Sequence, residues 1–133
     1  MSPVFVDTVG ILALQERSDQ WHEAAAQAWA VLLQADRPLV TTSLIFFECG
    51  NAAARKPYRA RIDEIRREFI ADGSLIQPTE AEIEDAWKAL VRGEAGQAGI
   101  VDHVSFLVMR RLGLTQAFTH DAHFRAAGFE TLF

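Results

Sequence analysis

The sequence predicts an α/β fold, a three-layer sandwich in which a central, mostly parallel five-stranded sheet carries helices on both faces. Short apolar runs rich in β-branched and aromatic residues alternate with longer segments of helical periodicity. This alternation is typical of βαβ units, whose strands are parallel and whose crossovers are right-handed. The 133 residues contain no repeat and no low-complexity stretch. We therefore expect one domain covering residues 1–133.

The N-terminal part is expected to contain a strand and a helix. Residues 3–6 form a short apolar run of β-branched and aromatic side chains, which is typical of a buried strand. Over residues 20–35, apolar side chains recur at helical spacing, and Asp19 stands in front of them as a cap. Pro38 prevents this helix from continuing.

The middle of the chain repeats the alternation. The run at 39–42 predicts a second strand, and a helix follows over 43–54 with a serine at its start. Another helix is expected at 58–71. A short strand at 74–77 is then ended by Pro78.

The last third begins with a capping box at residues 79–82, where a threonine is followed by a glutamate three positions later. From there the patterns predict, in order, a helix through Val91, a glycine-rich loop at 93–99, a helix over 101–112 ended by Gly113, a strand at 115–119, a short helix at 120–127 and a strand at 131–133.

Charge and cysteine content restrict the compartment and the partners. A net charge of −5 opposes phosphate binding over the whole surface, so a nucleic-acid partner needs a local basic patch. Basic residues crowd 55–67, and Arg55, Lys56 and Arg59 are the candidate RNA contacts; the alternative is a solvated helix face. With one cysteine, no signal-like start and no long apolar stretch, we expect a cytoplasmic protein that does not enter the membrane.

Four acidic residues are expected at one edge of the sheet. Asp7 follows the first predicted strand, and Asp121 comes just after the fourth. Asp102 lies in the first turn of a helix, and Glu48 lies about one turn into the helix that follows the second strand. Open parallel sheets bind their ligands beyond the carboxyl ends of the strands. The four carboxylates are therefore predicted to converge.

Each aspartate has a simpler explanation when it is taken alone. Asp at a helix start caps backbone N–H groups and suits the positive end of the helix dipole. Glu48 is not explained in this way, because its neighbours at 44–47 are all apolar. An unpaired buried carboxylate is costly, so it needs a cation or a raised pKa.

A divalent cation would relieve the repulsion among four converging carboxylates. Mg²⁺ in proteins is typically held by a few carboxylates together with water and substrate phosphate. Oxygen ligands favour Mg²⁺ or Mn²⁺ over zinc. Such an ion can activate water and stabilise the charge of a phosphate under attack.

Several segments of the sequence, in this order, resemble the PIN-domain nuclease family. No single segment is specific, but the ordered set covers nearly the whole chain. The segments are Phe5-Val6-Asp7-Thr8, Phe47-Glu48-Cys49-Gly50-Asn51, Val101-Asp102-His103-Val104-Ser105-Phe106, Thr119-His120-Asp121-Ala122-His123-Phe124 and Ala127-Gly128-Phe129.

The resemblance implies a PIN-like fold and a metal-dependent endoribonuclease that uses Mg²⁺ or Mn²⁺. The implied catalytic and metal-binding residues are Asp7, Glu48, Asp102 and Asp121, with polar companions at Thr8, Asn51, Ser105 and Thr119. A single-domain bacterial member of this size resembles the toxin half of a VapC-like toxin–antitoxin pair. A cognate antitoxin and a homodimer are then the expected protein partners, and RNA is the expected substrate.

Other interpretations remain open at this stage. His103 stands where the family commonly has a small residue, His120 where it has an apolar one, and His123 where an acid or a histidine occurs. Together they offer a zinc site, although no HExxH or paired-cysteine pattern accompanies them. An aspartate-based phosphatase needs a second acid where Val9 stands, and a receiver needs a lysine beyond Lys88. A non-toxin PIN nuclease, or a catalytically silent RNA- or protein-binding module, keeps the same fold.

Overall fold

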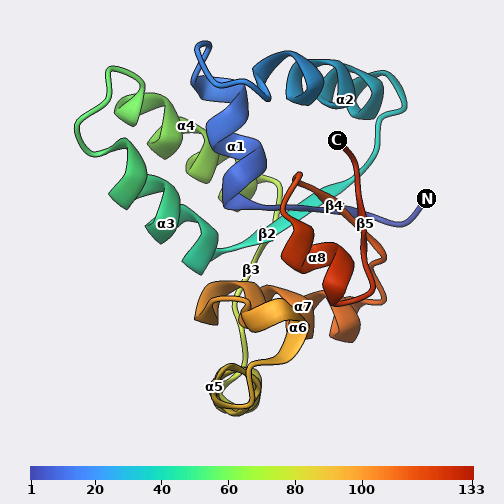
Figure 1. Cartoon of the computed structure of the whole chain (residues 1–133). Helices are drawn as coiled ribbons and strands as arrows, with labels where there is room; N and C mark the ends of the chain where they lie inside the picture. Colours follow the sequence, from blue (N-terminus) through green and yellow to red (C-terminus); the bar gives the residue numbers. More distant parts are fainter.

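The computed structural model describes all residues from 1 to 133 (Figure 1). Its elements are, in order, β1 (Val4–Val6), α1 (Thr8–Gln15), α2 (His22–Gln34), β2 (Leu39–Thr42), α3 (Ser43–Ala53), α4 (Arg59–Ala71), β3 (Leu75–Ile76), α5 (Glu80–Val91), α6 (Glu94–Gln97), α7 (Ile100–Leu112), β4 (Gln116–Phe118), α8 (Ala122–Ala126) and β5 (Glu130–Thr131).

The five strands form one parallel sheet in the order β3-β2-β1-β4-β5, which confirms the predicted fold class. Helices α1 to α4 lie on one face, and α5 to α7 lie on the other with α8 beside them (Figure 1). From β1 the chain first winds outward through β2 to β3. It then returns to place β4 on the opposite side of β1. The carboxyl ends of β1 and β4 therefore flank the switch point, where open sheets bind ligands.

The core follows from the apolar strands. Every residue of β1 is buried, and the aromatic side chains of Phe5, Phe106 and Phe124 pack against one another. Burial of this kind supplies the main favourable free energy of folding. It also holds the ends of β1 and β4 in fixed positions, which a preorganised site requires. None of the helices combines the length and apolar content that crossing a membrane requires.

Some sequence-based boundaries were wrong. Residues 8–15 form a helix that the sequence did not predict, and 94–97 form a short turn inside the expected loop, with Ala95, Gly96 and Gln97 in the left-handed conformation. The last strand lies at Glu130–Thr131 instead of 131–133. In α3 the side chain of Phe47 is 67% exposed, so the apolar segment around Glu48 is less buried than its composition indicates.

Helix α1 approaches strand β4 at a glycine. A Cβ atom added to Gly10 would overlap the carbonyl oxygen and the ring of Phe118, whereas one added to Gly50 of α3 would meet nothing. We expect Gly10→Ala to destabilise the fold by about 1–3 kcal/mol, the typical cost of overpacking. Gly50→Ala is the control. Alanine has a higher helix propensity than glycine, so this substitution should stabilise the fold by up to about 1 kcal/mol. Urea denaturation of the two variants measures both effects; equal stabilities would contradict the close approach.

Candidate functional site

The structure brings all four predicted acids to one hollow at the carboxyl edge of the sheet. This hollow, which we call the acidic pocket, is open and has a volume of about 610 Å³. It is lined by Asp7, Thr8, Val9, Glu48, Asn51, Ala52, Asp102 and Asp121. A second hollow of about 570 Å³ lies elsewhere, between α1, α2 and α4, and contains none of the four acids.

Each acid reaches the pocket from a different element. Asp7 directly follows β1, and Asp121 lies three residues after β4, the strand paired with β1. Asp102 lies in the first turn of α7, and Glu48 lies in the middle of α3. Because the elements meet at the switch point of the sheet, residues 114 positions apart in the sequence become neighbours.

Asp7 is the buried member of the group. It occupies the N-cap position of α1, but its side chain makes no capping hydrogen bond, so capping does not explain it. Instead, Thr119 Oγ1 donates to Asp7 Oδ2 at 2.8 Å. Burial raises the pKa of Asp7 from 3.8 to about 7, and the charge of Asp102 adds to the rise. A carboxylate in this environment is stabilised by a nearby cation.

Glu48 is held by a threonine on α1. Thr8 Oγ1 donates to Glu48 Oε1 at 2.6 Å. Both residues line the pocket together with the exposed Asn51, which lies one turn further along α3. Ser105 differs from these companions, because its hydroxyl donates to the carbonyl oxygen of Val101 in its own helix. It is not among the residues that line the pocket.

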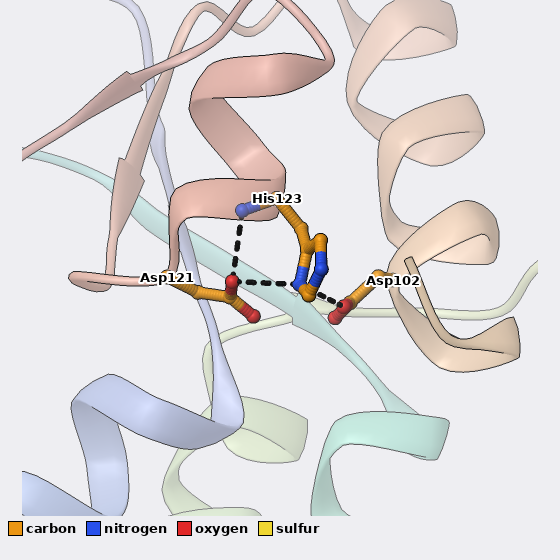
Figure 2. A group of neighbouring side chains, drawn as sticks. All are labelled: Asp102, Asp121 and His123. Atoms are coloured by element: carbon orange, nitrogen blue, oxygen red, sulfur yellow. Dashed lines mark hydrogen bonds and ion pairs between the residues drawn. The ribbon is translucent and has the colours of Figure 1, made fainter. Parts of the chain in front are cut away.

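Asp102 and Asp121 lie on either side of a histidine that the sequence analysis did not place in the site (Figure 2). His123 Nδ1 is 3.0 Å from Asp121 Oδ1 and 3.8 Å from Asp102 Oδ2. The pKa of Asp102 is raised to about 6, mainly by burial and next by the charges of Asp121 and Glu48. One oxygen from each aspartate and Nδ1 of His123 lie within 4.8 Å of one another.

The structure does not bring the three histidines together. His103 is buried against Phe106, and its Nε2 has no hydrogen-bond partner. His120 stacks on Trp21, with ring centroids 4.3 Å apart. A zinc site built from His103, His120 and His123 is therefore not supported. Spacing alone could not separate them, because all three lie near predicted acids in the sequence.

The basic segment at 55–67 is largely neutralised. Lys56 pairs with Glu16 at 3.0 Å. Three arginines of α4, Arg61, Arg66 and Arg67, pair with acids of the same helix. Arg59 donates to the backbone of Lys56. Arg55 and Arg59 are exposed and form no ion pair, so they are the members of the segment free to meet a phosphate.

Cys49 lies near the acids but is buried, and burial raises the pKa of its thiol to about 12. A thiol that stays protonated is a poor nucleophile. Cys49 is thus a packing residue of α3.

The donor set fits a hard divalent cation. Four carboxylates at one edge of a sheet, one of them fully buried, repel one another unless a positive charge is bound. Carboxylate oxygen atoms are the ligands that Mg²⁺ and Mn²⁺ prefer. The pocket is also open to solvent on one side, as binding of a polymeric substrate requires. Fold and site together define an α/β protein with a cluster of four carboxylates, suited to a divalent cation, at the carboxyl edge of its parallel sheet.

The chain belongs to the PIN domain family, whose family model matches residues 4–130. This confirms the resemblance predicted from the sequence. Among curated relatives, the 23S rRNA-specific endonuclease VapC20 of Mycobacterium tuberculosis is 33% identical over 132 residues, with 95% of each chain covered.

Solved structures agree with this assignment. The crystal structure of Mycobacterium tuberculosis VapC20, described as a sarcin-ricin loop cleaving toxin, matches with a TM-score of 0.76 and 28% identity over 95% of each chain. FitAcB from Neisseria gonorrhoeae matches with a TM-score of 0.66 at 14% identity, over 98% of this chain and 96% of that one. PAE2754 from Pyrobaculum aerophilum matches with a TM-score of 0.60 at 18% identity, over 98% and 90%. The last two show the fold alone.

Proposed function

We propose that this protein is a metal-dependent endoribonuclease that hydrolyses RNA phosphodiester bonds at the acidic pocket. The observation that carries the proposal is the convergence of Asp7, Glu48, Asp102 and Asp121 around one open hollow. Membership of the PIN family and the similarity to an rRNA endonuclease support the same activity.

In this proposal the chain's own residues bind and orient the ion. Asp7, Glu48, Asp102 and Asp121 hold Mg²⁺ or Mn²⁺, which supplies activated water and charge stabilisation at phosphorus when it is bound. Thr119 fixes one oxygen of Asp7, and its hydroxyl also accepts a hydrogen bond from the backbone N–H of Asp121 at 3.1 Å. One side chain thereby couples the ends of β1 and β4.

Thr8 performs the corresponding role for Glu48, since its hydroxyl donates to the carboxylate and leaves the second oxygen free. Supporting hydrogen bonds of this kind restrict the rotation of the acids and preorganise the site. Asn51, at the exposed rim of the pocket, is placed to meet a water molecule or the substrate. Arg55 and Arg59 are proposed to bind the RNA backbone nearby, as arginine suits phosphate.

Cleavage of a ribosomal RNA fragment tests the activity. Purified protein should cut an RNA that contains the sarcin-ricin loop in Mg²⁺ and should not cut it in EDTA. Glu48→Gln should be inactive in both, because it removes a charge but keeps the shape of the side chain. Gly50→Ala, two residues away in α3, is the matched control and should cut normally. Cleavage by Glu48→Gln at the wild-type rate would remove Glu48 from the site.

We further propose that the protein is the toxin of a toxin–antitoxin pair in the cytoplasm. An anionic pocket is a receptor for a cationic side chain, so an antitoxin can block the site by placing an arginine among the carboxylates. Co-expression with the product of a small reading frame immediately upstream should give a stable complex with suppressed nuclease activity. Separate purification of the two proteins, with cleavage unaffected, would contradict the toxin assignment and leave the nuclease assignment intact.

A homodimer is proposed as well. Trp87 and Val91 of α5 are 49% and 84% exposed, and they lie one turn apart on the helix. Trp29, by contrast, packs against Phe118 in the core. Large apolar side chains exposed on one helix are typical of a protein-binding surface.

A further inference from the structure

The imidazole of His123 lies between the carboxylates of Asp121 and Asp102, two of the residues that line the acidic pocket (Figure 2). Its Nδ1 atom lies 3.0 Å from Asp121 Oδ1 and 3.8 Å from Asp102 Oδ2. His123 lies in α8, a helix of five residues, and its backbone N–H donates to Asp121 Oδ1 at 2.9 Å. The same capping turn therefore fixes both the carboxylate and the position of the ring.

We propose that His123 is a nitrogen ligand of the metal centre, so that the site combines carboxylate and imidazole donors and selects Mn²⁺ over Mg²⁺. This inference rests on the proposed function, because it concerns the same ion. Imidazole binds Mn²⁺ and later transition metals, whereas Mg²⁺ retains a strong preference for oxygen. A single nitrogen ligand among oxygen ligands thus raises the affinity of the site for Mn²⁺ relative to its affinity for Mg²⁺.

The distances suit this role. Two ligands at right angles, each about 2.1 Å from an ion, lie about 3.0 Å apart. Nδ1 of His123 and Oδ1 of Asp121 have this separation. Oδ2 of Asp102 lies 3.8 Å from Nδ1 of His123, and one oxygen of each aspartate and Nδ1 lie within 4.8 Å of one another, so Asp102 is the neighbouring candidate for a third ligand. The ring reaches this position from the side of α6, where a Cβ atom added to Gly96 would lie 3.7 Å from Cδ2 of His123.

The competing interpretation is that His123 only pairs with Asp121. In that case the imidazole donates a hydrogen bond to the carboxylate and orients it, and the ion is bound by oxygen atoms alone. The two interpretations predict different surroundings for a bound Mn²⁺ ion. Only a direct ligand places a ¹⁴N nucleus next to the metal.

Pulsed electron paramagnetic resonance of the Mn²⁺-loaded protein separates them. Electron spin echo modulation should show the coupling of a directly bound imidazole ¹⁴N in the wild-type protein. His123→Asn should lose this coupling, because the amide offers an oxygen instead. His120→Gln is the control: His120 precedes Asp121 in the sequence but stacks on Trp21, so the coupling should persist.

Metal affinities provide a second readout that does not depend on activity. Competition between Mn²⁺ and Mg²⁺, followed by the signal of free Mn²⁺, should show Mn²⁺ binding about tenfold weaker in His123→Asn. Mg²⁺ binding should change by less than about threefold. Mn²⁺ that binds the wild-type protein without ¹⁴N coupling would overturn the inference and leave the proposed nuclease intact, and so would equal weakening of both ions in His123→Asn. A wild-type protein that binds neither ion would overturn both.

Discussion

Asp7→Asn should abolish RNA cleavage without unfolding the protein. Asparagine keeps the shape of the side chain and its ability to accept from Thr119, but it removes the charge at the most buried point of the metal site. We expect a loss of kcat of about 10²- to 10³-fold or more, as for other residues that stabilise charge in a transition state. Cleavage assays in Mg²⁺ measure the loss.

The same substitution should stabilise the metal-free protein at pH 8. Asp7 is buried, and it repels Asp102 and Asp121 when it is ionised. Removing that charge relieves a cost of up to about 4 kcal/mol, at about 1.4 kcal/mol for each pH unit by which the pKa is raised. Urea denaturation in EDTA measures the gain. Asp85→Asn, on the exposed surface of α5, is the control and should change stability by less than about 0.5 kcal/mol.

A fully active Asp7→Asn protein would remove Asp7 from the chemistry. A protein that is inactive because it is less stable than wild type at pH 8 would show that the carboxylate is structural. A metal ligand at Asp7 therefore requires that Asp7→Asn lowers activity and at the same time raises the stability of the metal-free protein.

Stability should also depend on pH in opposite ways with and without metal. The folded-state pKa of Asp7 is about 7 and that of Asp102 is about 6, both above the ordinary value of 3.8. The folded protein thus binds more protons than the unfolded chain between about pH 4 and pH 7. Without metal, the stability contributed by these two groups is full below pH 4 and is lost as the pH rises toward 7.

A bound divalent ion reverses this trend, because it competes with the same protons. Mg²⁺ affinity should rise from pH 5.5 to pH 8 as Asp102 and then Asp7 lose their protons. If affinity is about 1 mM at pH 8, then about 10 mM Mg²⁺ stabilises the fold by roughly 1.4 kcal/mol. This corresponds to a few degrees in melting temperature for a domain of this length.

Thermal denaturation at pH 5.5 and pH 8, in Mg²⁺ and in EDTA, measures the pattern. The melting temperature should be clearly higher in Mg²⁺ than in EDTA at pH 8, and nearly the same in both at pH 5.5. Asp7→Asn should show a smaller difference at pH 8. Melting temperatures that are equal in Mg²⁺ and EDTA at both pH values would contradict a preformed metal site.

The arrangement of strands was predictable because each strand is marked by a short β-branched or aromatic run between helices. Helix α1 was not, because residues 8–15 are apolar on nearly all sides and include a glycine in a segment of eight. The periodic signal of an amphipathic helix is then absent. Packing supplies what the local sequence does not, since Gly10 allows α1 to lie directly on Phe118.

The positions of the four acids were predictable for a topological reason. A residue that follows a parallel strand must lie at the carboxyl edge of the sheet, whatever its side chain. The hydrogen-bond partners of these acids could not be predicted from the sequence. Thr119 and Asp7, for example, are 112 residues apart, and no local pattern connects them. Ser105 was predicted as a companion of the acids from its position in a motif. That position did not reveal that its hydroxyl donates to the carbonyl oxygen of Val101 instead.

His123 and the basic segment show two further limits. Spacing places three histidines near the acids but does not give the direction of a ring, so only the structure distinguishes His123 from His120. The ion pairs of α4, in contrast, were visible as acids and arginines three or four residues apart, such as Asp63 with Arg66. These local charge pairs were the information needed to decide whether the basic segment at 55–67 binds RNA or forms a solvated helix face.

The chemistry of the cleaved RNA ends tests the central claim most directly. A carboxylate metal site directs water at phosphorus and does not need the 2′-hydroxyl of the RNA as a nucleophile. Purified protein acting on an end-labelled RNA in Mg²⁺ should leave a 5′-phosphate and a 3′-hydroxyl, and EDTA should stop the reaction. Cyclic phosphate and 5′-hydroxyl ends that still form in EDTA would indicate acid–base catalysis by side chains such as histidine. That result would contradict the assignment of Asp7, Glu48, Asp102 and Asp121 as the catalytic metal ligands.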